Sequence, residues 1–170
     1  MSVALRRMRE ADFPLIERWY AAPHMAPFFI EPGEIFTRDD VRRKFARRLS
    51  PDSEVKVFIA EADGVPFGSI QGYESRFNPQ IAALLHRPAA VLIDYFIGEA
   101  NCLGKGLGRA MLHSFQRDAM PGDFPGIDEV ALYHDVDNLA ALRCSASAGF
   151  APTHRFHWNQ KEQIAMVWRQ

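Results

Sequence analysis

Apolar positions along the chain follow two spacings, and each spacing predicts a different kind of element. Alternating or continuous apolar runs are typical of strands, and they cover residues 55–60, 65–73, 90–97, 129–133, 151–158 and 163–168. Apolar residues three and four positions apart are typical of helices, and they cover residues 12–20, 37–49, 79–85, 106–120 and 138–148. Helices and strands in this order predict an α+β fold with a mixed sheet flanked by helices.

Turn and cap residues mark the ends of several of these elements. Asp12 and Thr37 are suited to cap the first two helices, and Gly149 is suited to end the last one. The pair Asp63-Gly64 tolerates the positive φ that a tight hairpin needs. Stretches rich in Pro, Gly or Phe predict irregular loops, which cover residues 23–36 and 121–126.

Composition narrows the class of protein without changing the predicted fold. The chain has 170 residues, 48% of them hydrophobic and 24% charged, which suits one globular domain over residues 1–170. A formal net charge of -1 argues against broad attraction to nucleic acid. No apolar run approaches the ~20 residues that span a bilayer, and the N-terminus lacks the apolar segment of a signal peptide. We therefore expect a cytoplasmic protein without a nucleic-acid or membrane partner.

The metal-ligating residue types show no pattern that predicts a metal site. Cys102 and Cys144 are expected to be free thiols, because two distant cysteines form no zinc motif. His154 and His157 lie on a predicted strand whose alternating faces separate them, and no third ligand is near them in sequence.

The strongest chemical signal is a glycine-rich segment between a predicted strand and a predicted helix. Gly104, Gly106 and Gly108 alternate at the helix start. Glycines there let successive backbone N–H groups converge on an anion, and the helix N-terminus adds partial positive charge. The segment therefore predicts a site for a phosphate-bearing ligand.

Two common phosphate-binding motifs do not fit this segment. A Walker A loop places four residues between its first glycine and Gly-Lys, whereas five residues separate Gly98 from Gly104. The dinucleotide fingerprint Gly-x-Gly-x-x-Gly requires a wider last interval than the one from Gly106 to Gly108.

The same residues resemble those of the GCN5-related N-acetyltransferases (GNAT). Leu103 to Gly108 matches the loop motif Gln/Arg-x-x-Gly-x-Gly/Ala, with Leu103 in place of Gln or Arg, and Asn138 to Phe150 matches a second family signal. Asp94 to Gly108 and Phe58 to Tyr73 resemble the aminoglycoside 6'-N-acetyltransferases within this superfamily. The resemblance implies a mixed, mostly antiparallel sheet flanked by helices. It also implies acetyl transfer from acetyl-CoA, as co-substrate, to a small amine.

By this resemblance, two parts of the chain hold acetyl-CoA. The backbone at the end of the central strand would bind the pantetheine arm and polarise the thioester carbonyl. The implied coenzyme-binding residues are Phe96, Ile97, Gly98, Leu103, Gly104, Lys105, Gly106, Leu107, Gly108, Asn138 and Ser145. Asn138 is equally suited to be a helix N-cap. Ser145 stands where related enzymes carry a tyrosine that protonates the departing thiolate; serine is a far poorer acid, and water is the alternative donor.

The resemblance also assigns residues to the amine acceptor. Asp94 matches the acceptor-site aspartate of the aminoglycoside enzymes and would hold the ammonium and accept its proton. Glu99 is the second candidate for this catalytic role. The residues expected to line the acceptor pocket are Phe28, Phe29, Gln71, Tyr73 and Asp94.

Several alternatives for the function stay open at this point. The stretch 81–91 is apolar where the aminoglycoside enzymes are acidic, which also admits a siderophore-type hydroxylysine acetyltransferase. The serine at position 145 admits a non-catalytic acyl-CoA-binding module. Transfer to a protein N-terminus or lysine is a third alternative. A homodimer is one expected assembly.

Overall fold

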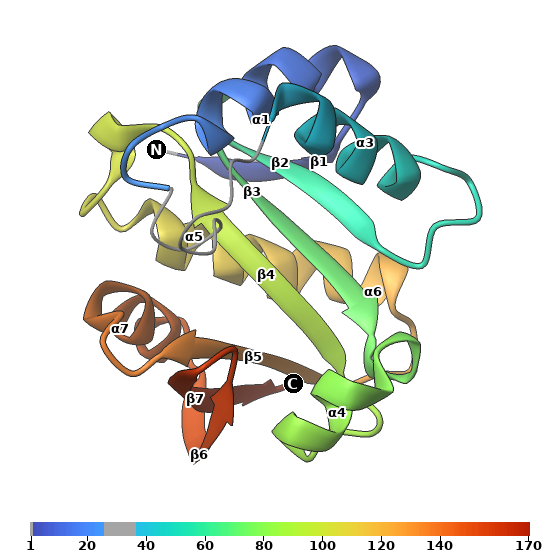
Figure 1. The fold of residues 1–170 in the computed structure, drawn as a ribbon, viewed down its shortest axis with the longest axis vertical. Coiled ribbons are helices and arrows are strands. Elements are labelled where there is room, and N and C mark those ends of the chain that lie inside the picture. The colour runs from blue at the N-terminus through green and yellow to red at the C-terminus, as the bar shows by residue number, and fades with distance from the viewer. Residues whose placement is uncertain (1, 26–36) are drawn as a thin grey trace.

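A mixed β-sheet forms the centre of the computed structural model, which describes residues 2–25 and 37–170 (Figure 1). The described residues form seven strands: β1 (Val3–Arg7), β2 (Lys56–Ala62), β3 (Val65–Glu74), β4 (Val91–Ile97), β5 (Glu129–Asp135), β6 (Ala151–Trp158) and β7 (Lys161–Arg169). Their order in the sheet is β1-β2-β3-β4-β5-β7-β6. Neighbouring strands are antiparallel except β4 and β5. The expected α+β fold with a mostly antiparallel sheet is confirmed.

Helices cover both faces of this sheet (Figure 1). The α-helices of the described residues are α1 (Phe13–Tyr20), α3 (Arg38–Arg48), α4 (Pro79–Leu85), α5 (Leu107–Ser114), α6 (Met120–Asp123) and α7 (Leu139–Ser147). Alternate strand residues point to opposite faces. Ile59 therefore packs with α1 and α3, whereas Phe58 packs with α5. Helix α4 lies on the same face as α1 and α3, against Leu92.

Strands β4 and β5 pair only at their starts. Their parallel register comprises Val91↔Val130 and Leu92↔Ala131. Beyond these residues the two strands diverge, as Figure 1 shows, while β4 stays paired with β3 along its other edge. The divergence leaves one edge of β4 without a strand partner from residue 93 onward. We call the gap between the two strands the splay.

Most expected turns and caps are present. Asp63 and Gly64 take positive φ values of 49° and 81° in the hairpin between β2 and β3. Thr37 caps α3 by accepting from the Asp40 N–H, and the Asp40 carboxylate accepts from the Thr37 N–H in return. Gly149 follows α7 with a φ of +90°. These local choices agree with the tertiary fold.

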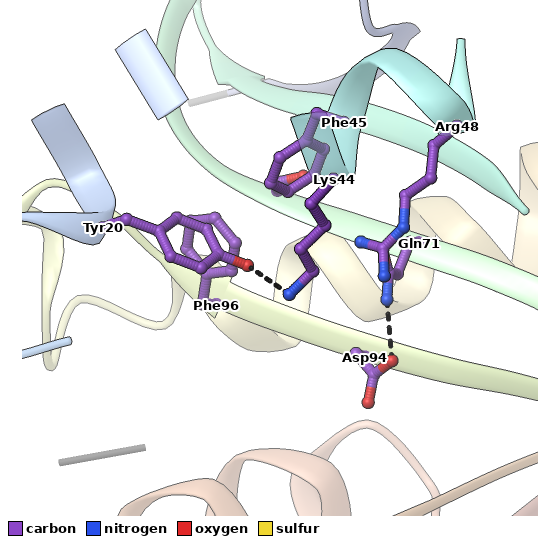
Figure 2. A pocket seen from close by; sticks show the side chains of 8 residues that line it. Tyr20, Lys44, Phe45, Arg48, Gln71, Asp94 and Phe96 are labelled. Carbon is purple, nitrogen blue, oxygen red and sulfur yellow. Dashed lines mark hydrogen bonds between the residues drawn. The ribbon is translucent and has the colours of Figure 1, made fainter. Parts of the chain in front are cut away.

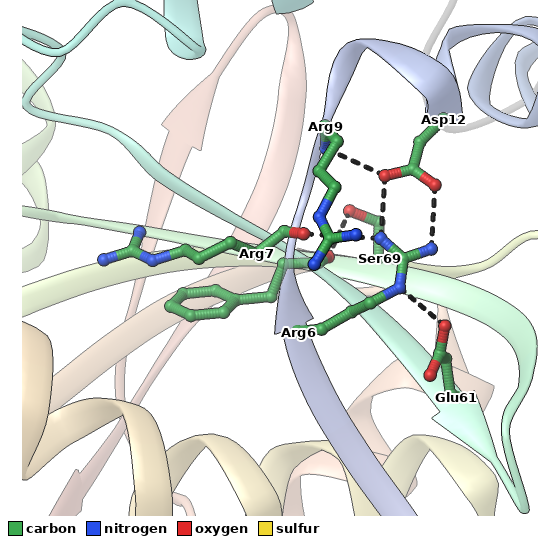
Figure 3. A network of polar contacts seen from close by, with 7 residues as sticks. Arg6, Arg7, Arg9, Asp12, Glu61 and Ser69 are labelled. Carbon is green, nitrogen blue, oxygen red and sulfur yellow. Dashed lines mark hydrogen bonds and ion pairs between the residues drawn. The ribbon is translucent and has the colours of Figure 1, made fainter.

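Asp12 has a different task from the one expected. It precedes α1, but its carboxylate makes no cap hydrogen bond to that helix. It accepts two hydrogen bonds from the Arg6 guanidinium, each 2.8 Å long, and a third from the Arg9 N–H (Figure 3). Asp12 thus ties β1 to the turn Glu10–Asp12, because Arg6 offers a stronger charged partner than the helix N-terminus.

Strand β1 was not predicted. Only Val3 and Leu5 alternate as apolar residues before the basic pair Arg6 and Arg7, which is too short a pattern to identify a strand. Its backbone pairs with β2 in the register Val3↔Ala62. A long-range edge pairing of this kind leaves little trace in the local sequence.

The prediction that the helix starting near residue 106 ends at Met120, before a loop, was wrong. The helix passes through a π-helical turn, Phe115–Ala119, and continues as α6 to Asp123. Pro121 lies in the first turn of α6, where its missing N–H and fixed φ are tolerated. The π turn lets a proline continue the helix. Within the described residues, no helix has the length and apolar character needed to cross a membrane.

Candidate functional site

The loop between β4 and α5 exposes a row of backbone N–H groups. Gly104 and Gly106 adopt left-handed conformations, with φ of +69° and +76°. Within the described part of the chain, the N–H groups of residues 104–109 have no backbone acceptor, and no side chain caps α5. They lie at the positive end of the helix dipole. The loop therefore has the geometry of an anion site, as the sequence indicates.

Other residues of the expected coenzyme loop lie around this N–H row. Leu103 is 47% exposed although it is apolar, and Lys105 is exposed beside it. Leu107 and Gly108 are buried, where α5 packs against the sheet. Leu103 and Lys105 are therefore accessible to a ligand on the loop, whereas the side chain of Leu107 anchors the helix.

The unpaired edge of β4 presents the backbone of alternate residues to the splay. The Gly98 N–H donates to the Phe67 carbonyl, so the backbone of Gly98 points toward β3. Residues two apart share an edge, so Phe96 also points toward β3, while Tyr95 and Ile97 point toward the splay. The backbone groups of Phe96 and Gly98, both expected to hold the coenzyme, therefore face β3, whereas those of Tyr95 and of the expected residue Ile97 face the splay.

His24 meets this same edge and was not anticipated. Its Nε2 lies 3.0 Å from the Ile97 carbonyl oxygen. His24 follows α1 in sequence, and nothing in the local pattern distinguishes it from a loop histidine. Only the packing of α1 against the end of β4 brings the two together.

Asp94 lies on the face of β4 that α1 and α3 cover, at a cavity of about 230 Å³. The Gln71 amide, opposite Asp94 in the β3–β4 register, donates to its carboxylate at 2.8 Å. Arg48 in turn donates to the Gln71 carbonyl oxygen (Figure 2). The sequence expectation that Gln71 and Asp94 share one site agrees with this arrangement.

Helix α3 contributes residues to this cavity that the sequence reading missed. Lys44 and Arg48 line it with Phe45. Burial lowers the pKa of Lys44 to about 8, aided by the neighbouring Arg48 charge. The helical spacing could have indicated this position, because residues 44 and 48 lie three positions after the buried residues 41 and 45 and so share their face of the helix.

Aromatic side chains form the rest of the cavity wall. Tyr20 and Phe96 line it and meet edge to face, with ring centroids 5.7 Å apart (Figure 2). Tyr20 also accepts a hydrogen bond from Lys44 at 3.3 Å. Such walls suit the apolar or sugar-like part of a small ligand.

Two expected acceptor residues lie within the described chain but outside this cavity lining. Tyr73 follows Gln71 on the same face of β3 and packs beside α4. Burial raises its pKa to about 12. The Glu99 carboxylate accepts from the Trp19 indole N–H at 2.8 Å and pairs with Arg18. Glu99 thus links α1 to the end of β4, so these contacts give Glu99 a structural role. Phe28 and Phe29 lie outside the described residues.

Helix α7 forms the wall of the splay opposite α5. Asn138 caps α7 by accepting from the Ala141 N–H at 3.2 Å. Ser145 is fully buried, so its side chain presents no surface to a ligand. Its hydroxyl lies 3.0 Å from the Tyr95 hydroxyl and 2.9 Å from His134 Nε2. The expected coenzyme contact by the Ser145 side chain is therefore not supported by its position, since its hydroxyl faces Tyr95 and His134 instead.

Cysteine and histidine side chains do not gather around a common point. Among residues 2–25 and 37–170, no three His, Cys, Asp or Glu side chains are placed to hold one metal ion. Cys102 and Cys144 are free thiols. His154 stacks on His86, with ring centroids 4.3 Å apart, and approaches the Leu84 carbonyl.

Comparisons with known proteins agree with this architecture. Aminoglycoside N(6')-acetyltransferase type 1 of Klebsiella pneumoniae and that of Serratia marcescens are each 26% identical to the chain over 159 residues, which covers 88% of this chain and 74% of theirs. The structure of AAC(6')-Ib in complex with coenzyme A and kanamycin superposes with a TM-score of 0.82 at 24% identity, covering 99% of this chain and 95% of the other.

A more distant structure shares the same fold. The aminoglycoside N(6')-acetyltransferase of Legionella pneumophila superposes with a TM-score of 0.73 at 19% identity, over 99% of this chain and 92% of that one. The model of the acetyltransferase (GNAT) domain family matches residues 8–168. The chain therefore belongs to the GNAT acetyltransferase family.

Proposed function

We propose that the protein transfers the acetyl group of acetyl-CoA to the amine of a small molecule. The observation that carries this proposal is the edge of β4 that, among the described residues, has no strand partner from residue 93 onward. This edge supports the proposal because the same strand carries Asp94 and leads to the loop whose N–H groups of residues 104–109 have no backbone acceptor in the described chain. The two relatives named aminoglycoside N(6')-acetyltransferase support the reaction class.

The coenzyme end of the site is built from backbone. The N–H groups around Gly104 and Gly106 would receive the pyrophosphate, with Lys105 as a nearby countercharge. From there an extended pantetheine arm fits along the open edge of β4 as an additional strand-like segment. The N–H groups of Tyr95 and Ile97 are then available to the arm and to the thioester carbonyl.

The acceptor end of the site is built from side chains. The Asp94 carboxylate, oriented by Gln71, would hold the substrate ammonium and take its proton, directly or through water. The neutral amine then attacks the thioester carbonyl across the edge of β4. Asp94 and the Tyr95 backbone are adjacent in sequence, which places base and carbonyl-binding group side by side.

A thiol-release assay with acetyl-CoA and an amine tests the proposal. Asp94→Asn should lower kcat/KM about 100-fold, the usual scale of a lost general base. Acetyl-CoA affinity by calorimetry should stay within about twofold of the unaltered protein, because the proposed coenzyme contacts are backbone N–H groups that the substitution does not remove. Asp52→Asn, in an exposed turn after α3, is the matched control and should change neither quantity.

Two outcomes would contradict the proposal. Unchanged turnover of Asp94→Asn would remove Asp94 from the mechanism. Acetyl-CoA binding without thiol release from any amine would favour a non-catalytic acyl-CoA-binding module.

The charge of the acceptor cavity favours a second candidate substrate. Lys44 and Arg48 line it beside Asp94. Two cations there oppose a polycationic aminoglycoside and suit an amine that also carries a carboxylate, such as a siderophore-type hydroxylysine. Kanamycin, tobramycin and N6-hydroxylysine compared in the same assay separate the two: release with hydroxylysine alone selects the second candidate, and release with the antibiotics alone selects the first.

A further inference from the structure

Three polar side chains from three different elements meet beneath the splay. Tyr95 comes from β4, His134 from β5 and Ser145 from α7. The Ser145 hydroxyl bridges the other two, 3.0 Å from Tyr95 Oη and 2.9 Å from His134 Nε2. The rings of Tyr95 and His134 stand nearly perpendicular, at 83°, with centroids 5.8 Å apart. Ser145 is fully buried, and Tyr95 and His134 are partly buried.

The position of this cluster relates it to the reacting atoms. Tyr95 and His134 each lie three residues beyond the last parallel pair, Leu92↔Ala131, where the strands begin to separate. Both side chains point to the face that α5 and α7 cover, opposite to Asp94. The ring of Tyr95 lies 4.0 Å from the point that a Cβ on Gly108 would occupy, so it also borders the coenzyme loop.

On the basis of the proposed acetyl transfer, we propose that Tyr95, oriented by Ser145 and His134, protonates the thiolate of coenzyme A as it leaves. A thioester whose carbonyl accepts from the Tyr95 N–H carries its sulfur in the same splay. The amine arrives from the Asp94 side of β4, so the sulfur departs toward the Tyr95 side. Tyr95 is then the catalytic acid, and Ser145 and His134 are positioning residues.

The step conserves atoms and charge. The amine nitrogen forms the C–N bond, and the C–S bond breaks with its electron pair going to sulfur. Nitrogen loses two protons, one from the ammonium before attack and one as the C–N bond forms, and both pass through Asp94 or water to solvent. The Tyr95 hydroxyl proton passes to the thiolate, and solvent returns one proton to the Tyr95 phenolate. The net products are the amide, coenzyme A thiol and one proton released to solvent.

The hydrogen-bond directions support a donor at Tyr95. Burial lowers the pKa of His134 to about 4, so its imidazole is neutral near pH 7. In the tautomer protonated at Nε2, His134 donates to Ser145, and Ser145 donates to the Tyr95 oxygen. The Tyr95 hydroxyl proton then points to the Ala141 carbonyl oxygen at 3.5 Å, a long contact that it would exchange for the sulfur. Burial also raises the pKa of Tyr95, which keeps its hydroxyl protonated.

Steady-state kinetics of Tyr95→Phe test this role, because the substitution removes only the hydroxyl. We expect kcat to fall about 10- to 100-fold, with acetyl-CoA Kd by calorimetry and both KM values within about threefold. Ser147→Ala, which removes an exposed hydroxyl from the same helix as Ser145, is the matched control and should leave kcat within about twofold. Ser145→Ala should lower kcat by a smaller factor with the same unchanged KM values.

Each result decides between named outcomes. An unchanged kcat in folded Tyr95→Phe would overturn the inference while leaving the proposed function intact. If that variant does not fold, Ser145→Ala decides: a lower kcat at constant KM supports the relay, and an unchanged kcat overturns it. No thiol release by the unaltered protein would overturn the proposed function itself, and this inference with it.

Discussion

At the scale of single residues, the role of a charged side chain depends on the partner that the fold places beside it. Asp12 is the clearest example away from the site, since it is only 8% exposed and binds Arg6 through both oxygens. The Arg6 guanidinium lowers the pKa of Asp12, and Arg6 also donates to Glu61 at 2.6 Å. One guanidinium therefore joins β1, β2 and the turn before α1 (Figure 3).

Removing this carboxylate charge should weaken the fold. Asp12→Asn is expected to lower the free energy of unfolding by about 1–3 kcal/mol, the cost of breaking a charged hydrogen-bond pair. Because the folded pKa of Asp12 is depressed, its contribution is complete above about pH 4, the unfolded value, and is lost as the pH falls below that. Urea denaturation from pH 3 to pH 7 measures both effects.

The matched control is the exposed pair of Arg117 and Asp118, whose side chains are 67% and 49% exposed. Asp118→Asn should cost much less at pH 7, because solvent screens an exposed pair. Equal losses in the two variants would show that the partial burial of Asp12 does not matter.

At the scale of elements, the start of α5 combines a left-handed backbone conformation at Gly106 with an open surface. Gly106 has a φ of +76°, and a Cβ built on it meets nothing within 4 Å. An alanine there would therefore fit sterically but would be strained in its backbone. We therefore expect the substitution to change the direction of the loop N–H groups and to cause no steric clash.

Gly106→Ala should cost about 1 kcal/mol of stability and weaken acetyl-CoA binding about 3- to 10-fold. Gly126→Ala is the matched control, because Gly126 has a φ of +82° and equally open surroundings beyond the far end of α6. It should cost similar stability without changing acetyl-CoA affinity. Thermal unfolding and calorimetry measure the two quantities, and equal affinities in the two variants would contradict the loop assignment.

At the scale of the whole molecule, a partly buried histidine of β5, His134, contacts both β4 and α7. His134 has a folded pKa of about 4 against an ordinary value of 6.5, because burial disfavours its charged form. A depressed folded pKa means that stability is complete above about pH 6.5 and is lost as the pH falls toward 4. At about 1.4 kcal/mol per pH unit, the gap corresponds to about 3 kcal/mol.

His134→Gln should remove this part of the pH dependence, because glutamine does not titrate. The free energy of unfolding of the variant should change less between pH 7 and pH 4 than that of the unaltered protein. His157→Gln, at an exposed position on β6, should keep the original slope. Parallel curves for the unaltered protein and His134→Gln would contradict the assignment of a buried neutral imidazole.

The sequence by itself determined most of the elements, though not β1 or the end of the helix after residue 106, and it determined the glycine loop. The family resemblance singled out Asp94, whose catalytic role stays a prediction. Helical and strand spacing, the Thr37 cap and the Asp63-Gly64 turn are local properties, so they can be read without a partner segment. The glycine loop could also be predicted from the sequence, because alternating glycines at the start of a helix are typical of an anion-binding loop.

Only the tertiary structure decided which side chains meet. It brought Arg48 from α3 to Gln71, turned the Tyr95 backbone instead of that of Phe96 to the splay, and placed Tyr95 and His134 on Ser145. The physical reason is that strand alternation and helix packing convert sequence positions into faces only when the register and the neighbouring elements are known. The serine that looked like a missing acid is, in the fold, the contact of a tyrosine 50 positions away.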